Sequence, residues 1–323
     1  MRKIIIDTDT GSDDAVAILM ALRDPSVQVL AVTTVCGNVN MEQATVNAFR
    51  SIDAAQTYVP PVHKGAYRPL MRDAVTAENV HGRDGMGDIG LPVPDMLPEK
   101  EHAVEAILRL VRENPGEVEI VTLGPATNLA LAIMKDPEAM KLVKHIYSMG
   151  SGGYGMGNVT SVAEFNVFVD AEAYKVMVEF AVPKTLVGID ICWLPGAFFE
   201  EEEIEAIRSE GPVSKFAMDC NEALIEYSRR VRGRRKLDLP DPYAMGVALW
   251  PEIVTEAHDC YCYVCTDQTP AYGQVIVDHH KFQAVDKSKL PRHAPNARVI
   301  KSVDTSLFKQ RLRAALKTET VTG

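Results

Sequence analysis

The fold is decided by the stretch Lys3-Ile4-Ile5-Ile6-Asp7-Thr8-Asp9-Thr10-Gly11-Ser12-Asp13-Asp14-Ala15. Its apolar start, residues 3–6, predicts a short buried strand, and four carboxylates follow within the next eight residues. From residue 13 to residue 23, the apolar side chains of Ala15, Ile18, Leu19 and Leu22 recur at helical spacing. The stretch therefore predicts a strand, an acidic turn and a helix, which together make one unit of an α/β protein.

Further strand and helix patterns alternate along the chain. We expect strands at 27–35, 59–62, 118–123, 145–149 and 184–189, and helices at 41–54, 101–113, 126–134 and 171–180. Repeated units of this kind predict a mostly parallel, twisted sheet flanked by helices, an open Rossmann-like α/β fold.

The remaining segments differ in composition. Residues 64–98 are rich in Gly, Pro and Asp and predict a long loop, whereas 198–231 are mostly helical and predict a small cap. Short strands at 260–265, 274–277 and 297–300 and a helix at 306–316 are expected at the end. Because we find no repeat and no linker, residues 1–323 are expected to form a single domain.

Composition excludes several classes of protein. Hydrophobic residues make up 46% and charged residues 24%, as in ordinary globular proteins, so a disordered chain is excluded. The formal net charge of −10 argues against nucleic acid as a partner. No apolar run is long enough to span a bilayer, so no membrane partner is expected. Six cysteines in 323 residues do not make a disulfide framework, and we expect a cytoplasmic protein with reduced thiols.

The acidic turn after the first strand predicts a metal site. Ligands of parallel α/β sheets bind at the carboxyl ends of the strands, where Asp7, Asp9, Asp13 and Asp14 lie. Oxygen ligands alone favour a hard divalent cation, Ca²⁺ or Mg²⁺. An EF-hand loop is excluded, because Ile18 stands where its final Glu belongs. An aspartyl phosphatase of the haloacid-dehalogenase type, with Asp7 as nucleophile, remains an alternative, although Gly11 stands in place of its Thr.

Other predicted strand ends and loops add amides and carboxylates. These side chains are Asn38, Asn128, Asn158, Glu164, Asn166 and Asp241. Together they could line one crevice. Such groups bind neutral polyols, whereas a phosphate would favour Arg, Lys or helix N-termini.

These blocks resemble the inosine-uridine preferring nucleoside hydrolases. The similarity is carried by 7–15, by Thr33-Thr34-Val35-Cys36-Gly37-Asn38, by Val80-His81-Gly82-Arg83-Asp84-Gly85-Met86-Gly87, by 157–166 and by Asp241-Pro242. It implies the nucleoside hydrolase fold and hydrolysis of the N-glycosidic bond of ribonucleosides with a bound Ca²⁺. It also implies a role in purine or pyrimidine salvage and a homodimer or homotetramer.

The resemblance also implies a role for individual residues. Asp9, Asp14, Asp241 and the backbone carbonyl of Leu123 would ligate Ca²⁺, and Asp9 would also be the general base. The ribose hydroxyls would be held by Asp13, Asn38, Asn158, Glu164 and Asn166. An acidic pocket of this kind would stabilise the positive charge that grows on the ribose in the transition state.

One position departs from the family pattern. Many relatives carry His directly before the late Asp as the acid that protonates the leaving base, and here that residue is Pro240. Candidates to replace it are His81, Tyr227 or an Arg of the run 229–236. Phe165 and Trp193 are candidates to stack on the base. A binding homologue without catalysis therefore remains a second alternative.

The run itself contains Arg229, Arg230, Arg232, Arg234, Arg235 and Lys236. A solvated helix face or a subunit contact is the plain interpretation of such a run. The alternative interpretation is a phosphate clamp that admits a nucleotide.

Overall fold

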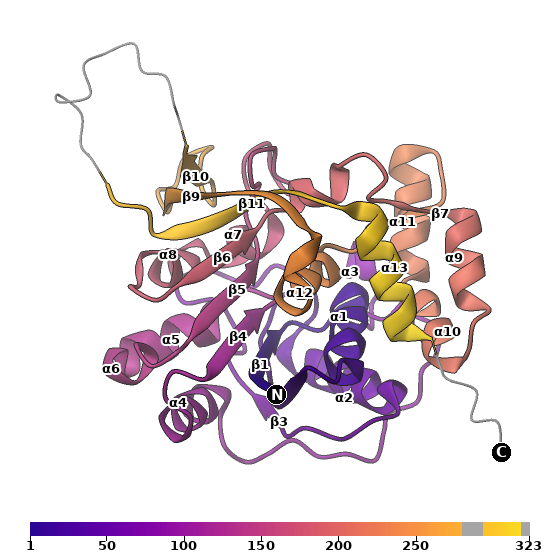
Figure 1. Ribbon diagram of the computed structural model, residues 1–323, viewed down its shortest axis with the longest axis horizontal. Coiled ribbons are helices and arrows are strands. Elements are labelled where there is room, and N and C mark those ends of the chain that lie inside the picture. Colours follow the sequence, from indigo (N-terminus) through magenta and orange to yellow (C-terminus); the bar gives the residue numbers. More distant parts are fainter. Residues whose placement is uncertain (280–292, 318–323) are drawn as a thin grey trace, which may run out of the picture.

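A nine-stranded sheet runs through the protein in a computed structural model that describes residues 1–279 and 293–317 (Figure 1). Across the sheet the order is β3 (Val62–Lys64), β2 (Val27–Thr34), β1 (Arg2–Thr8), β4 (Val118–Thr122), β5 (His145–Met149), β6 (Lys184–Val187), β11 (Ala297–Val303), β9 (Val254–Val264) and β10 (Val275–Asp278). Neighbours from β3 to β11 are parallel, and β9 runs antiparallel to both β11 and β10. The predicted fold class, an α/β fold with a mostly parallel sheet, is confirmed.

The order of the strands reverses at β1. The chain runs outward from β1 through β2 to β3, and then returns to place β4 on the other side of β1. The loops that leave the carboxyl ends of β1 and β4 therefore diverge and leave a crevice between them. Such a switch point is where open α/β sheets bind their ligands.

Helices cover both faces of this sheet. One face carries α1 (Ser12–Arg23), α2 (Met41–Ala55), α12 (Pro240–Leu249) and α13 (Thr305–Leu316), and the other carries α4 (Ala103–Glu113), α5 (Thr127–Lys135), α6 (Pro137–Met140) and α8 (Ala171–Glu179). Successive side chains of a strand point to opposite faces, so Ile4 and Ile6 join the first apolar cluster while Ile5 joins the second. Burial on both sides explains why β1 is an unbroken apolar run.

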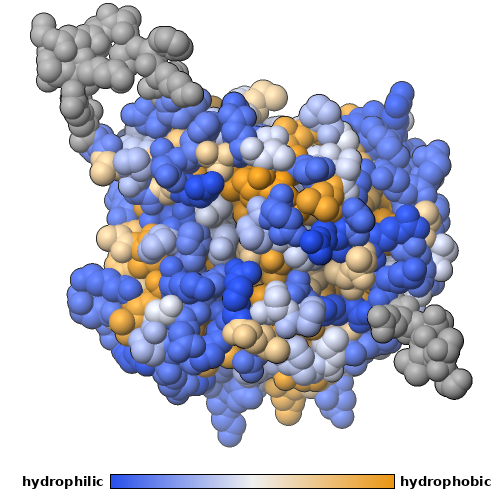
Figure 2. All heavy atoms as spheres, viewed as in Figure 1, coloured by the Kyte–Doolittle hydropathy of each residue, from blue (hydrophilic) through white to orange (hydrophobic). Residues whose placement is uncertain are grey.

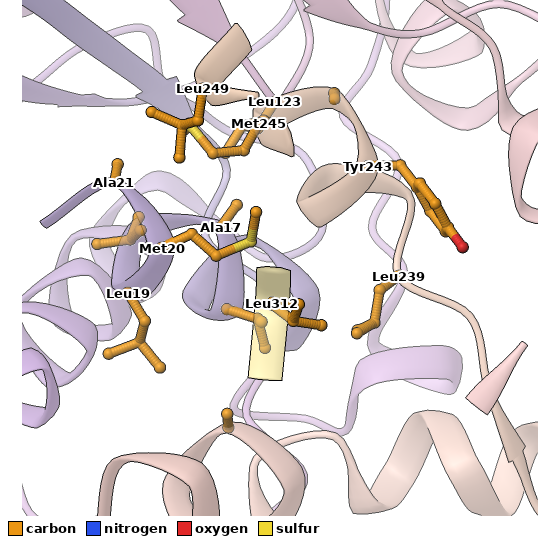
Figure 3. Close-up of a cluster of buried hydrophobic side chains, with 14 of the residues drawn as sticks. Ala17, Leu19, Met20, Ala21, Leu123, Leu239, Tyr243, Met245, Leu249 and Leu312 are labelled. Atoms are coloured by element: carbon orange, nitrogen blue, oxygen red, sulfur yellow. The ribbon is translucent and has the colours of Figure 1, made fainter. Parts of the chain in front are cut away.

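An apolar cluster packs α1 against α12, and the first turns of both helices carry aspartates. In Figure 3 Ala17, Met20 and Ala21 of α1 lie beside Met245 and Leu249 of α12 and Leu312 of α13. All residues from Ser12 to Leu22 are buried. Because α1 and α12 are locked together in this way, the first turns of the two helices hold fixed positions relative to each other.

A helical cap stands beside the sheet at the right of Figure 1. It consists of α9 (Glu201–Arg208), α10 (Pro212–Asp219) and α11 (Glu222–Arg232). A two-stranded sheet of β7 (Phe199–Glu200) and β8 (Lys236–Leu237) joins its two ends. This agrees with the helical segment predicted at 198–231. The remaining short helical pieces are α3 (Glu78–His81), α7 (Phe165–Val169), η1 (Ile189–Trp193) and η2 (Pro251–Ile253).

Five predicted strands have a bound that is wrong by more than one residue. Two of them are too short: the strand placed at 3–6 ends at Thr8, and the strand placed at 297–300 ends at Val303. The strand placed at 59–62 lies at Val62–Lys64, because Pro60 and Pro61 have no N–H to donate to a neighbouring strand. The strand placed at 184–189 ends at Val187, and the 3-10 turn η1 follows. The strand placed at 260–265 begins earlier, at Val254. Its first half is partly exposed and carries polar side chains, which concealed it in the sequence.

The face of the protein drawn in Figure 2 is largely hydrophilic. Figure 2 shows polar residues over most of one face, with apolar residues scattered in small groups. Within residues 1–279 and 293–317, no helix is both long enough and apolar enough to cross a membrane.

Candidate active site

A pocket of about 300 Å³ lies at the switch point of the sheet. All but two of the residues assigned to catalysis, to the sugar, to the base or to the metal line it: Asp13, Asn38, His81, Leu123, Asn158, Glu164, Phe165, Asn166, Trp193, Tyr227 and Asp241. The other two, Asp9 and Asp14, are fully buried and interact electrostatically with Asp241 of the lining. The structure thus gathers residues from position 13 to position 241 around one cavity.

Three carboxylates meet at the floor of the pocket. Asp13 and Asp14 stand in the first turn of α1, and Asp241 stands in the first turn of α12. One oxygen of each lies within 4.8 Å of the others, close enough to hold a single metal ion. This group contains Asp13, which the resemblance assigned to the sugar, rather than Asp9.

The chain around Asp9 leaves no freedom for its side chain. The backbone N–H of Asn38 donates to Asp9 Oδ2 at 2.6 Å. A Cβ atom added at Gly37 would lie 2.0 Å from Asp9 Oδ2, and one added at Gly124 would lie 2.8 Å from Asp9 Oδ1. Gly37 and Gly124 lie in the loops after β2 and β4, the two strands that flank β1. A side chain at either position would collide with Asp9.

Asp14 is oriented by three donors. Thr8 Oγ1 donates to Oδ1 at 2.5 Å, and Oδ2 accepts from Gly11 N at 2.9 Å and from Asn38 Nδ2 at 3.1 Å. Asn38 therefore contacts Asp9 through its backbone and Asp14 through its side chain. In the loop that follows β2, Asn38 serves to hold these two acids.

Several buried carboxylates lie close together at the floor, which favours the binding of a cation there. Burial, followed by the neighbouring carboxylates, raises the pKa of both Asp9 and Asp241, and burial raises the pKa of Asp13 to about 6. Within the described part of the chain, Asp9 Oδ1 and Asp13 Oδ1 are buried without a hydrogen-bond partner. An oxygen-only donor set with unsatisfied oxygens and crowded negative charge fits a hard divalent cation.

The opposite wall is built on α7. Glu164 caps this helix, with its carboxylate accepting from the N–H groups of Asn166 and Val167. Asn166 Nδ2 donates to the Leu123 carbonyl at 2.5 Å, so this carbonyl faces the site. Asn158 Oδ1 accepts from Phe165 N at 2.9 Å, which ties the glycine-rich loop to the helix. Burial raises the pKa of Glu164 to about 7.

The candidates for the leaving-group acid lie in the lining together with Pro240. His81 Nδ1 is 2.9 Å from Ser12 Oγ and 3.7 Å from Asp13 Oδ1. Burial lowers the pKa of His81 to about 4. Tyr227 comes from α11, and the guanidinium of Arg230 lies 5.7 Å from the centre of its ring. His81 and Tyr227 thus reach the pocket from α3 and α11, whereas Pro240 occupies the position of the usual acid at the start of α12.

Asp7 lies outside this lining. It is fully buried, and its Oδ1 accepts from Thr33 Oγ1 at 2.6 Å and from Asn128 Nδ2 at 2.8 Å. These contacts tie β1 to β2 and to α5. The expectation that Asn128 lines the crevice is therefore wrong, because its side chain binds Asp7 and the Thr34 carbonyl instead. A phosphatase mechanism would need the Asp7 carboxylate as an accessible nucleophile, so the geometry does not support that alternative.

Sequence reasoning missed a part of the lining. The missed residues are Ala77, Val80, Met149, Val159, Ile189, Leu224, Val231 and Asp238. Most are ordinary apolar residues that carry no local signal. Asp238 lies only three residues before Asp241, and an acid so close to a proposed ligand is a signal that could have found it.

Comparison with known proteins agrees with this geometry. Residues 4–310 match the family described as inosine-uridine preferring nucleoside hydrolase. The pyrimidine-specific ribonucleoside hydrolase RihA of Escherichia coli O7:K1 is 34% identical over 316 residues, which cover 97% of this chain and 98% of RihA. The structure of a plant nucleoside hydrolase, the PpNRh1 enzyme, superposes with a TM-score of 0.90 at 30% identity over 98% of this chain and 99% of that one. A purine-preferring ribonucleoside hydrolase from Gardnerella vaginalis gives a TM-score of 0.87 at 28% identity, with 98% of each chain covered.

The fold, the acidic pocket and these similarities together define a glycosidase of nucleosides. The chain belongs to the inosine-uridine preferring nucleoside hydrolase family, and it is an enzyme that cleaves the N-ribosyl bond of nucleosides.

Proposed function

We propose that the protein hydrolyses ribonucleosides to free base and ribose with the help of a bound Ca²⁺. The observation that carries this proposal is the meeting of Asp13, Asp14 and Asp241 at the floor of a pocket whose walls are lined by amides and aromatic rings. The family resemblance supplies the choice of Ca²⁺ among the hard divalent cations. It also supports a homodimer or homotetramer as the assembled enzyme.

The metal would be held by Asp9, Asp14 and Asp241 through their carboxylates and by the Leu123 carbonyl, with Asp13 close enough to contribute. Supporting this set, the side chain of Asn166 already fixes the Leu123 carbonyl, and Asn38 fixes two of the acids. When bound, Ca²⁺ would lower the pKa of water at the site and neutralise the crowded carboxylates.

The remaining groups of the floor would act on the sugar and on water. Asp9 has one oxygen without a hydrogen-bond partner among the described residues, so it is available to take a proton as general base. Asp13 and Asn38 would hold the 2′-hydroxyl, and Asn166 the 3′-hydroxyl. Asn158 and Glu164 would hold the 5′-hydroxyl. Buried carboxylates around the ribose would stabilise its positive charge in the transition state.

The outer part of the pocket would bind the base. Phe165 and Trp193 both line the cavity and offer rings for stacking. His81 and Tyr227 are the side chains proposed to protonate the leaving base. The similar proteins include one named for pyrimidines and one named for purines, so the base preference of this chain requires measurement.

The experiment is a release assay for free ribose with inosine, guanosine, adenosine, uridine and cytidine, each with and without added Ca²⁺. Release from at least one ribonucleoside supports the proposal, and its base preference follows from the ranking of kcat/KM. If the protein binds nucleosides without releasing ribose from any of them, it is a binding homologue and the proposal is wrong.

A further inference from the structure

A second cleft opens beside the pocket. It has a volume of about 510 Å³ and is lined by Met156, Trp193, Phe198, Arg232, Arg234 and Lys236. We call it the basic cleft. Trp193 and Arg232 line both the basic cleft and the main pocket, so the two cavities adjoin at these side chains. A substrate in the pocket could therefore extend a substituent into the basic cleft.

The basic cleft carries positive charge in a chain whose formal net charge is −10. Its lining contains three cations and no acid. Arg232 lies 3.2 Å from Asp238, and Lys236 lies 2.6 Å from Glu200. By contrast, Arg234 is exposed and has no hydrogen-bond or ion-pair partner in the parts of the chain that the structure describes. At least one full positive charge is thus free to meet an anion.

Phe198 holds two of these cations in place. The guanidinium of Arg232 lies 4.7 Å from the centre of the Phe198 ring, and the Lys236 ammonium lies 5.6 Å from it. Contacts of cations with an aromatic ring restrict long, flexible side chains. Less conformational entropy is then lost when an anion binds, which favours a real binding site over a merely solvated basic segment.

The position of the cleft indicates which end of a substrate reaches it. Met156 of the basic cleft and Asn158 of the main pocket belong to the same glycine-rich loop, two residues apart. Under the proposed function, Asn158 lies at the 5′-hydroxyl of the ribose. A group attached to that oxygen would pass Asn158 and meet Met156 and then the cations.

We propose that the basic cleft binds the 5′-phosphate of a ribonucleoside monophosphate, so that the enzyme also cleaves nucleotides. This inference rests on the proposed function for its chemistry, which is the same hydrolysis of the N-ribosyl bond by water. Arg and Lys side chains are well suited to phosphate, because each can make charge-assisted hydrogen bonds to its oxygens.

The test compares two substrates that differ only in the phosphate: the nucleoside that the enzyme cleaves best and its 5′-monophosphate. In Arg234→Ala, the ratio of kcat/KM for the nucleotide to kcat/KM for the nucleoside should fall about ten-fold, the loss expected from one charge-assisted contact. Arg234→Lys should keep most of the ratio. Arg229→Ala is the matched control, because Arg229 belongs to the same run but pairs with Glu226 and lines neither cavity.

Inhibition by ribose 5-phosphate and by ribose gives a readout that does not depend on turnover of a nucleotide. Ribose 5-phosphate should inhibit the unmodified enzyme about ten-fold more tightly than ribose, and Arg234→Ala should remove this difference. The inference is overturned if neither ratio changes in Arg234→Ala. It is equally overturned if Arg234→Ala lowers activity only on a nucleoside with a carboxylate on the base, such as orotidine. It is also overturned if Arg234→Glu dissociates an oligomer, as measured by light scattering, while both ratios stay constant. Absence of ribose release from every nucleoside would instead contradict the proposed function.

Discussion

The floor and the outer wall of the pocket are built in different ways. The floor is made of buried carboxylates at the end of β1 and at the starts of α1 and α12. Two of them, Asp9 and Asp14, are held by backbone N–H groups, and glycines pack tightly against Asp9. The outer wall is made of partly or fully exposed side chains: Tyr227 and Arg232 from the cap, Phe165 from α7 and Trp193 from η1. The floor is thus rigid and acidic, whereas the wall is aromatic and basic.

This difference assigns different tasks to the two regions. A rigid cluster of like charges is costly to bury, and such groups are retained at functional sites because they bind a cation or move a proton. The wall carries no comparable cost and can change its contacts without unfolding the protein. We therefore expect substitutions in the floor to abolish the reaction, and substitutions in the wall to change which substrates are cleaved.

The largest effect is expected for Asp241→Asn, which removes one charged ligand while keeping the shape of the side chain. Loss of metal binding should cost several kcal/mol of transition-state stabilisation, on the order of 10³-fold in turnover. Thermal unfolding provides the measurement: Ca²⁺ should raise the unfolding temperature of the unmodified protein but not that of the variant. An equal rise in both proteins would remove Asp241 from the metal site.

Asp9→Asn tests the proton transfer in the floor. Loss of a general base typically slows a reaction by about 10²–10⁴-fold. We therefore expect kcat to fall by at least this much, since Asp9 is also a proposed metal ligand, while ribose still binds. Asp7→Asn is the control, because Asp7 is as deeply buried as Asp9 but its carboxylate is engaged by Thr33 and Asn128, away from the three acids of the metal group. If Asp7→Asn instead stopped turnover and the unmodified enzyme formed a covalent phosphate adduct, the phosphatase alternative would return.

The two candidates for the leaving-group acid, His81 and Tyr227, both line the pocket. A general acid contributes about 10²–10⁴-fold, and an activated substrate such as p-nitrophenyl riboside does not need one. If His81 or Tyr227 is the acid, then His81→Ala or Tyr227→Phe should slow nucleoside cleavage but leave cleavage of the activated riboside almost unchanged. Equal losses on the two substrates would show that neither side chain is the acid.

The smallest effects are expected for the rings of the wall. Stacking of a base on an aromatic ring is worth about 1–3 kcal/mol, so Trp193→Ala should raise KM about ten-fold or more. A purine has the larger ring system, so the rise should be larger for purine nucleosides than for pyrimidine nucleosides. Phe165→Ala provides the comparison for the other proposed stacking ring of the lining. No change in KM for either variant would place both rings in a purely structural role.

The floor could be predicted from the sequence because its signals are local. Parallel strands end at one edge of the sheet, so Asp9, Asn38 and Leu123, which follow three neighbouring strands, were expected to come close together. The end of β1 itself was placed too early, because β1 continues through the buried Asp7 to Thr8. The helix starting at Met41 with Asn40 as its cap, and the strand at His145–Met149, were likewise set by neighbouring residues.

The wall could not be predicted to the same degree. Val80 and Leu224 enter the pocket because α11 packs against α3, which are segments more than 140 residues apart in the chain. The partnership of Arg232 with Asp238 depends on how the chain turns after α11. Contacts of this kind leave no periodic pattern in the sequence, since they depend on the packing of the cap as a whole.

Metal-dependent turnover tests the central claim most directly. The enzyme is stripped of divalent cations with a chelator, and ribose release from its best nucleoside is followed while Ca²⁺ is added back, with Asp241→Asn treated in parallel. The account predicts no ribose release from the stripped protein, full recovery of the unmodified enzyme with Ca²⁺, and no recovery of the variant. Full activity of the stripped enzyme in the presence of chelator would contradict it.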